Sequence, residues 1–187
     1  DELSTYGRSG SRLGGHVDNH IPGIEISTGS LGHGLGIGAG LALSFKLNQE
    51  DPLAVVLMGD GECYEGSVWE AALFAAHHQL HRLIAIVDRN RQISMEYTEN
   101  CNQLEPFDEK WKSFGWDVTK VDGHCIEELL HVFKDVRTRS SKKPMVIIAE
   151  TIKGKGVSFM EGKLPWHHNV PKGEQVEQAR KELALND

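Results

Sequence analysis

Oxygen-bearing side chains follow two apolar runs in the middle of the sequence. The run from Leu53 to Met58 precedes Gly59-Asp60-Gly61-Glu62, and the run from Leu83 to Val87 precedes Asn90. A carboxylate and an amide oxygen are ligands that Mg²⁺ accepts in proteins, with other coordination places left to phosphate oxygens and water. The glycines on either side of Asp60 permit a tight turn and close approach of the backbone to a bound group. The chemistry indicated is that of a metal ion holding a diphosphate.

The elements between these residues must bring them together. Both apolar runs are typical of strands buried on both faces of a parallel sheet, and the alanine-rich segment from Glu65 to about His78 predicts a helix between them. A right-handed crossover returns the second strand end to the edge that carries the first, where α/β sheets bind ligands. The alternative is an ordinary turn followed by a helix cap, because Asp and Gly are common turn residues.

Together with its surroundings, this pattern resembles the thiamine diphosphate motif, and the likeness narrows to transketolases over roughly residues 10–171. The resemblance implies thiamine diphosphate as the cofactor and Mg²⁺ as its metal, for which Ca²⁺ or Mn²⁺ can substitute. The implied metal ligands are Asp60, Asn90 and the backbone carbonyl of Gln92. The implied cofactor contacts around them are Gly59, Asp60, Gly61, Glu62, Asn90 and Ile93. Ile93 takes the packing role on the thiazolium, because the positions where the family usually has an apolar residue hold Gln92 and Ser94.

Further implied site residues lie near the start of the chain. The stretches from Gly10 to His16 and from Ile21 to Gly34 resemble a family segment with a substrate-contacting histidine followed by a glycine-rich cofactor loop. A histidine among glycines is accessible and able to exchange a proton near neutral pH, although a surface histidine would look the same. The resemblance makes His16 catalytic, through hydrogen bonds to substrate oxygens. It also brings a loop of three residues to the aminopyrimidine and the bend of the cofactor: Gly29, Ser30 and Leu31.

Two later segments also resemble the family. The stretch from Glu150 to Gly156 resembles the lysine-glycine loop beside the diphosphate, which implies that Lys153 contacts the cofactor. The stretch from Trp166 to Pro171 resembles a closing loop and implies that His167 is both catalytic and cofactor-binding, with His168 as the alternate. Paired histidines can also bind zinc, but no third ligand stands at a usable spacing.

One acidic residue carries an implied interface role. Glu65 resembles the glutamate that meets its counterpart across the family's dimer interface and couples the two sites. A solvated glutamate at a helix start is the alternative, because negative charge is favourable there.

The predicted fold class is α/β, a thiamine-diphosphate-binding fold with a mainly parallel sheet and helices on both faces. Strands are expected at 53–58, 83–88, 117–121 and 145–150. Helices are expected from His33 to before Asp51-Pro52 and from Pro106 to Phe114, with a surface helix within 172–187. A further helix at 126–136 is predicted to bury one apolar stripe made of Ile126, Leu129, Leu130, Phe133 and Val136. The glycine repeat at 32–40 does not match the dinucleotide fingerprint, and no Walker sequence is present.

Length and charge narrow the class of protein. The 187 residues are expected to form a single pyrophosphate-binding domain, 1–187, in which the amino-terminal part of the family's domain is absent. A net charge of −7 without a basic cluster argues against nucleic acid and membrane as partners. Apolar runs too short to span a bilayer and a start without signal-peptide features favour a cytoplasmic protein. Three cysteines without Cys-x-x-Cys spacing suggest neither disulfides nor a structural zinc site.

The resemblance implies one chain of a split transketolase that moves a two-carbon ketol unit from a ketose phosphate to an aldose phosphate. It further implies a second subunit with the pyrimidine-binding domain and its glutamate, in an α2β2 assembly, so the isolated chain is expected to be inactive. Two alternatives remain open: the α subunit of a 2-oxo acid dehydrogenase, which shares the Gly-Asp-Gly and Asn pattern, and a non-catalytic binding subunit that keeps the fold. The stretch from Pro22 to Gly34 favours transketolase over the dehydrogenase, and intact Asp60 and Asn90 argue against the non-catalytic protein.

Overall fold

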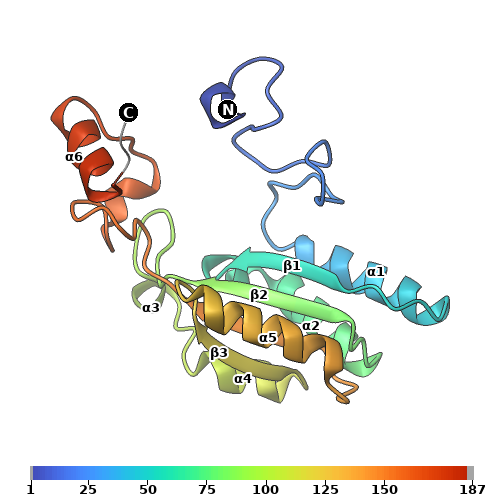
Figure 1. The fold of residues 1–187 in the computed structure, drawn as a ribbon. Helices are drawn as coiled ribbons and strands as arrows, with labels where there is room; N and C mark the ends of the chain where they lie inside the picture. Colours follow the sequence, from blue (N-terminus) through green and yellow to red (C-terminus); the bar gives the residue numbers. More distant parts are fainter. Residues whose placement is uncertain (1, 185–187) are drawn as a thin grey trace.

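A parallel four-stranded sheet is the centre of the computed structural model, which describes residues 2–184 (Figure 1). Its strands follow the order β1-β2-β4-β3. They are β1 (Ala54–Gly59), β2 (Leu83–Arg89), β3 (Asp117–Asp122) and β4 (Met145–Glu150). All three pairings are parallel, with β2 and β4 in the middle. The predicted α/β class, the four strands and their parallel direction are therefore confirmed.

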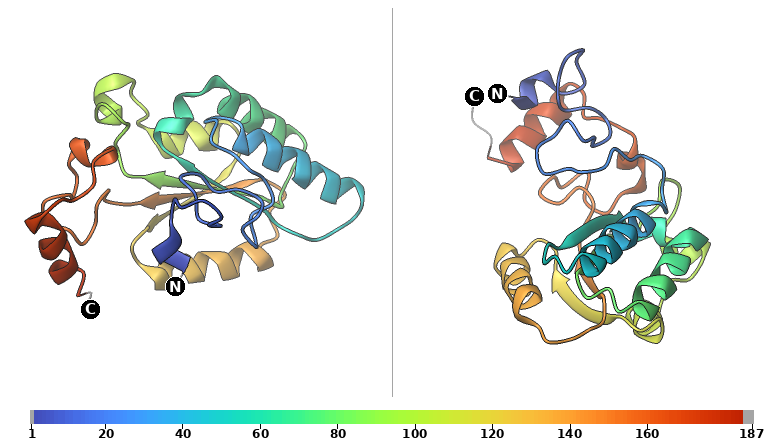
Figure 2. Two further views of the ribbon diagram at one scale, coloured as in Figure 1. Left: turned by 90° about the horizontal axis from the view of Figure 1, so that it is seen from above. Right: turned by 90° about the vertical axis from the view of Figure 1, so that its right-hand side faces the viewer.

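Helices cover both faces of the sheet. The helices α1 (Gly34–Leu47), α2 (Gly66–His77) and α4 (Phe107–Ser113) pack on one face, and α5 (Ile126–Thr138) packs on the other (Figure 2). Short helical turns lie after the carboxyl ends of β1 and β2, namely η2 (Gly61–Tyr64) and α3 (Thr98–Cys101). The flanking parts of the chain hold η1 (Glu2–Thr5), η3 (Leu164–His167) and α6 (Glu174–Glu182), and α6 agrees with the predicted surface helix.

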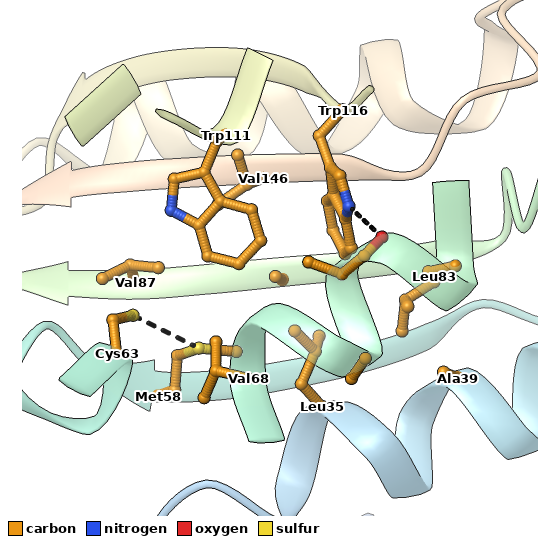
Figure 3. Close-up of a cluster of buried hydrophobic side chains, with 14 of the residues drawn as sticks. Leu35, Ala39, Met58, Cys63, Val68, Leu83, Val87, Trp111, Trp116 and Val146 are labelled. Carbon is orange, nitrogen blue, oxygen red and sulfur yellow. Dashed lines mark hydrogen bonds between the residues drawn. The ribbon is translucent and has the colours of Figure 1, made fainter. Parts of the chain in front are cut away.

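The larger core lies between the sheet and the three helices on its first face. Trp111 and Trp116 are buried there with their ring centroids 5.0 Å apart, in the same cluster as Val87 and Val146 (Figure 3). The indole of Trp116 donates to the carbonyl of Ala72 on α2 at 3.0 Å, which satisfies a polar group that would otherwise be costly to bury. These contacts attach α2 and α4 to the same strands, and α2 follows directly on the turn that carries Asp60.

The smaller core corrects the predicted stripe of α5. Val132 and Val136 are buried, whereas Ile126 and Leu130 are 62% and 55% exposed. Leu129 and Phe133 pack partly against this core. The apolar arc predicted for α5 was too wide. Leu130 lies about 100° around the helix axis from Leu129, and its side chain is therefore turned away from the sheet toward solvent. Ile126, as the first residue of the helix, is also left in solvent.

The face that α5 covers is not covered over its whole width. Residues of β1 alternate between the two faces, and Val55 and Leu57 are 49% and 72% exposed on the side of α5. Residues before α1 and after β4 extend away from the layered body (Figure 1). Within residues 2–184, no helix has both the length and the apolar character needed to cross a membrane.

Candidate functional site

Asp60 and Asn90 meet at one edge of the sheet, as the crossover argument predicted. Asp60 directly follows β1 and Asn90 directly follows β2, and the register sets Gly59 beside Asp88. The amide of Asp60 donates to the carbonyl of Asp88 at 3.1 Å, which extends the pairing by one more residue. The two predicted ligands therefore leave adjacent strands within one residue of each other in register, at the carboxyl edge where α/β sheets bind ligands.

The carboxylate of Asp60 is buried and held by three donors. Its Oδ1 accepts from the amide of Gly61 at 2.8 Å, which caps η2. Its Oδ2 accepts from the amide of Arg91 at 2.6 Å and from Nη1 of Arg89 at 3.0 Å. Burial raises the pKa of the Asp60 carboxyl, and the hydrogen bonds from Arg91 and Arg89 oppose that shift. The side chain thus has one fixed orientation.

The backbone after Asn90 turns a carbonyl oxygen toward the same place. Gln92 and Tyr97 form an isolated antiparallel bridge in which Ile93 donates to Glu96. In such a pair the N–H and C=O of Gln92 point away from Tyr97. The N–H of Gln92 does so by donating to Oδ1 of Asn90 at 3.0 Å. The carbonyl of Gln92, on the same side, accepts no hydrogen bond from residues 2–184.

The atoms that this edge offers to a metal ion are therefore oxygens. Among the described residues, no group of three or more His, Cys, Asp or Glu side chains could hold a metal ion. A cation here would need the amide oxygen of Asn90 and the carbonyl of Gln92 beside Asp60, and oxygen donors suit Mg²⁺. The side-chain Oε1 of Gln92 is also buried without a partner in the described part of the chain. An unpaired buried acceptor is costly and indicates that this edge is shaped for an additional group.

The glycine-rich loop before α1 is fastened to the turn after β1. Oε1 of Glu62 accepts from the amide of Gly32 at 2.9 Å, and Oγ of Ser67 donates to the carbonyl of Gly32 at 2.8 Å. Gly32 has φ of +82°, and a Cβ there would lie 2.6 Å from Cβ of Glu65. Only a residue without a side chain fits this contact. Glu62 thus holds the loop in which the other predicted cofactor contacts lie.

His16 lies against that loop. A Cβ on Gly29 would come within 3.0 Å of Cδ2 of His16, so the imidazole packs on the backbone of Gly29. Asp18, Ser27 and Thr28 line the same shallow depression. His16, Gly29, Ser30 and Leu31 are all exposed, and so is Glu65 at the start of α2. The structure brings His16 and Gly29 together but leaves their outer surface open.

Lys153 and His167 form a third group. Nζ of Lys153 lies 2.9 Å from Nδ1 of His167, whose ring lies 4.6 Å from that of His168. Partial burial, the charge of Lys153 and His168 together lower the pKa of His167. The hydroxyl of Tyr97 donates to the carbonyl of Gly162 at 3.1 Å, which links this region to the loop after Asn90. Within residues 2–184, no hydrogen bond or ion pair joins His16, Lys153 or His167 directly to the predicted metal ligands.

One residue at this edge, Arg89, was not predicted from the sequence. Arg89 is completely buried, and its guanidinium bonds to Asp60 and Thr98 through Nη1. Its Nη2 donates to Glu99 and Glu105 at 2.8 Å each. The signal available was a charged residue at the end of a buried strand, which is rarely tolerated without partners.

The fold and this edge define an α/β domain with an oxygen-donor site at the carboxyl ends of two adjacent parallel strands. Residues 1–187 match the family described as Transketolase, thiamine diphosphate binding domain, and the chain belongs to that family.

Curated relatives agree with this membership. The chain is 45% identical over 180 residues to an apulose-4-phosphate transketolase subunit of Phocaeicola vulgatus, covering 96% of this chain and 64% of the relative. It is 41% identical over 167 residues to a 6-deoxy-6-sulfo-D-fructose transketolase subunit of a Clostridium species, covering 89% and 60%. Human transketolase is 36% identical over 183 residues, covering 97% of this chain and 29% of that protein. The chain thus spans less than two thirds of the length of these relatives.

Solved transketolases share the fold. The structure from Campylobacter jejuni has a TM-score of 0.85 with 29% identity and covers 98% of this chain and 30% of that one. A transketolase mutant from Pichia stipitis has a TM-score of 0.86 with 27% identity, covering 99% and 29%.

Proposed function

We propose that this chain holds thiamine diphosphate and its Mg²⁺ in a transketolase that moves a two-carbon ketol unit from a ketose phosphate to an aldose phosphate. The observation that carries the proposal is the meeting of Asp60, Asn90 and the free carbonyl of Gln92 at one sheet edge. These three residues are the metal ligands we propose. The donor set fits Mg²⁺, because it consists of oxygens and leaves places for phosphate oxygens.

The rest of the edge fits the organic part of the cofactor. A Cβ on Gly59 would meet open space, and Gly61 packs under Ile93, which can offer an apolar contact to a ring. Glu62 supports the contact surface indirectly by holding the loop of Gly29, Ser30 and Leu31 through Gly32. When bound, thiamine diphosphate supplies the electron sink that lets the carbon–carbon bond beside a carbonyl break.

The chain's own residues bind and orient around that group. Lys153 carries a positive charge suited to diphosphate oxygens, and it holds His167 with the ring nitrogen Nδ1 as acceptor. The lowered pKa of His167 favours the neutral ring, which can exchange a proton through Nε2. His16, exposed beside Gly29, can donate to or accept from substrate hydroxyl oxygens.

A second polypeptide completes the site in this proposal. The relatives from Phocaeicola vulgatus and Actinobacillus succinogenes are each named as one subunit of their transketolase, and His16, Leu31 and Glu65 lie exposed on this chain. We propose that a partner with the pyrimidine-binding domain covers that surface in an α2β2 assembly, with Glu65 at the interface. Closing the surface would exclude water from the reacting atoms.

The transketolase proposal is favoured over the 2-oxo acid dehydrogenase, since the relatives and structures described above are transketolases or transketolase subunits. The test is to measure ketol transfer from a ketose phosphate to an aldose phosphate by the chain with a candidate partner, Mg²⁺ and thiamine diphosphate. Turnover is expected with the partner and not without it. Turnover of a 2-oxo acid instead would identify the dehydrogenase, and absence of Mg²⁺-dependent thiamine diphosphate binding would refute the site.

A further inference from the structure

His124 lies in the turn after β3, and its Nε2 accepts a hydrogen bond from the amide of Ile152 at 2.8 Å. Ile152 directly precedes Lys153, whose Nζ lies 2.9 Å from Nδ1 of His167. We propose that His124 is a positioning residue, which fixes the start of the lysine-glycine loop so that Lys153 stays within reach of His167 and of the diphosphate. This inference rests on the proposed function, because it concerns the group of Lys153 and His167 described above.

The turn that carries His124 is held in place from two sides. The amide of Gly123 donates to the carbonyl of Glu150, the last residue of β4, at 2.8 Å. The amide of Asp122 donates to Oε2 of Glu128 on α5 at 2.9 Å. The amide of His124 itself donates to Oδ1 of Asp122 at 2.8 Å, as in an Asx turn. His124 therefore stands on backbone that β4 and α5 both anchor.

Gly123 lets this turn approach the loop closely. A Cβ at Gly123 would lie 2.5 Å from Cγ2 of Thr151 and 3.1 Å from the carbonyl oxygen of Glu150. A residue with a side chain would push the turn away from the loop. The ring of His124 would then move away from the amide of Ile152, so the contact between the two depends on the glycine.

The hydrogen bond from Ile152 anchors the chain directly before Lys153. One residue earlier, the amide of Thr151 donates to the carbonyl of Arg89 at 3.2 Å, which ties the start of the loop to β2. Ile152 is 42% exposed, so burial of its side chain contributes little to holding the backbone at this position. The direction in which the chain enters Lys153 therefore depends on the contact with His124.

The imidazole of His124 is neutral in this contact. An amide nitrogen can only donate, so Nε2 accepts and carries no proton. A side chain without an acceptor would leave the amide of Ile152 unpaired. Glutamine can replace the ring, because its amide oxygen stands as many bonds from Cα as Nε2 does. Leucine cannot, since it has a similar length but no acceptor.

A general structural role predicts a different result. If His124 only stabilised the fold, its loss would add to the loss of Lys153, because the two effects would be independent. If His124 acts by placing Lys153, its loss should have no further effect once the lysine has been removed. A double-mutant cycle between the two positions therefore separates positioning from general support.

The test uses His124→Leu, His124→Gln, Lys153→Gln and the double variant that combines His124→Leu with Lys153→Gln. His124 is exposed, so its variants should fold. His131→Leu is the matched control, because His131 is an exposed histidine on α5, 3.3 Å from Asp135 of the same helix. Affinity for thiamine diphosphate is measured by calorimetry in excess Mg²⁺. The ring titration of His167 is followed by NMR without metal or cofactor, and thermal unfolding is recorded alongside.

We expect His124→Leu to weaken thiamine diphosphate binding by about 3- to 10-fold, which corresponds to the loss of one hydrogen bond. His124→Gln should keep most of the affinity, and His131→Leu should keep all of it. In the Lys153→Gln background, His124→Leu should cause no further loss. Additive losses at the two positions, or unchanged affinity in His124→Leu, would overturn the inference.

The titration of His167 tests the same point without a cofactor. Partial burial and then the charge of Lys153 lower the pKa of His167, so His124→Leu should raise that pKa in the direction that Lys153→Gln does. An unchanged pKa of His167 in folded His124→Leu would overturn the positioning role, even if binding changed. If the wild-type chain shows this coupling but does not bind thiamine diphosphate with Mg²⁺, the proposed function fails instead.

Discussion

Ile93 lies directly over Gly61: a Cβ placed on Gly61 would come within 2.6 Å of Cγ2 of Ile93. The two residues belong to different segments, one after β1 and one after β2, so this contact sets how closely the two loops approach. The loop that carries the proposed carbonyl ligand is thereby seated on the turn that carries Asp60.

Gly61→Ala should displace the loop of Ile93 and weaken cofactor binding. The added methyl overlaps a β-branched side chain, and overpacking of this kind costs about 1–3 kcal/mol. The second change Ile93→Ala makes room, so the double variant should recover part of the lost affinity for thiamine diphosphate with Mg²⁺. Calorimetric titration of the four proteins forms a double-mutant cycle. Strictly additive losses would show that the contact does not set the loop position.

Ser67→Ala and Glu62→Ala should each release the glycine-rich loop, because each removes one of the two hydrogen bonds that hold Gly32. A cost of about 1 kcal/mol is expected for each bond, together with weaker thiamine diphosphate binding. Glu70→Ala is the control, because Glu70 is an exposed residue of α2, the helix that also carries Ser67. Hydrogen exchange of the Gly32 amide reports the effect directly. Unchanged protection would contradict the role of these two hydrogen bonds in holding the loop.

Two substitutions on α5 should have unequal effects on stability. Val136 is 3% exposed and Leu130 is 55% exposed. Val136→Ala should lower the free energy of unfolding by about 1–2 kcal/mol, because it removes buried methyl groups. Leu130→Ala removes more atoms yet should change it by no more than about 0.5 kcal/mol. Urea unfolding of both variants decides whether the apolar stripe is as narrow as the structure shows.

The strands and the meeting of Asp60 with Asn90 could be predicted because they follow from short-range rules. Continuous apolar runs predict buried parallel strands, and the handedness of the crossover fixes which edge receives both residues. The prediction that the carbonyl of Gln92 is a metal ligand came from the family resemblance and not from these rules. The direction of this carbonyl depends on the bridge to Tyr97, which no local pattern shows.

Arg89 and the burial pattern of α5 could not be predicted for a related reason. The partners of Arg89 lie in three separate places along the chain, at Asp60, at Thr98 with Glu99, and at Glu105. A single charged residue gives no information about which of these it will meet. The apolar residues of α5 likewise allow more than one angle of the helix on the sheet, and only packing chooses among them.

Asp60→Asn should abolish Mg²⁺-dependent binding of thiamine diphosphate and should also destabilise the chain. The side chain of Asp60 is buried and accepts a hydrogen bond from Arg89. Replacing the charged acceptor should lower the free energy of unfolding by on the order of 2 kcal/mol. Thermal unfolding without metal measures that cost, with Asp88→Asn as a comparison on the adjacent strand. Retained metal-dependent binding in Asp60→Asn would remove Asp60 from the ligand set.

Lys153→Gln should raise the pKa of His167. Partial burial is the first cause of its lowered pKa and the charge of Lys153, 2.9 Å away, is the second, so removing the charge removes part of the shift. A lowered pKa in the folded state means that the unfolded chain binds more protons just below the ordinary histidine value of about 6.5, so stability rises with pH across that window. In Lys153→Gln this rise should be smaller. Titration of the His167 ring by NMR measures the pKa, and Lys155→Gln, an exposed lysine of the same loop, should leave it unchanged. An unaltered pKa in Lys153→Gln would mean that burial alone sets the protonation of His167.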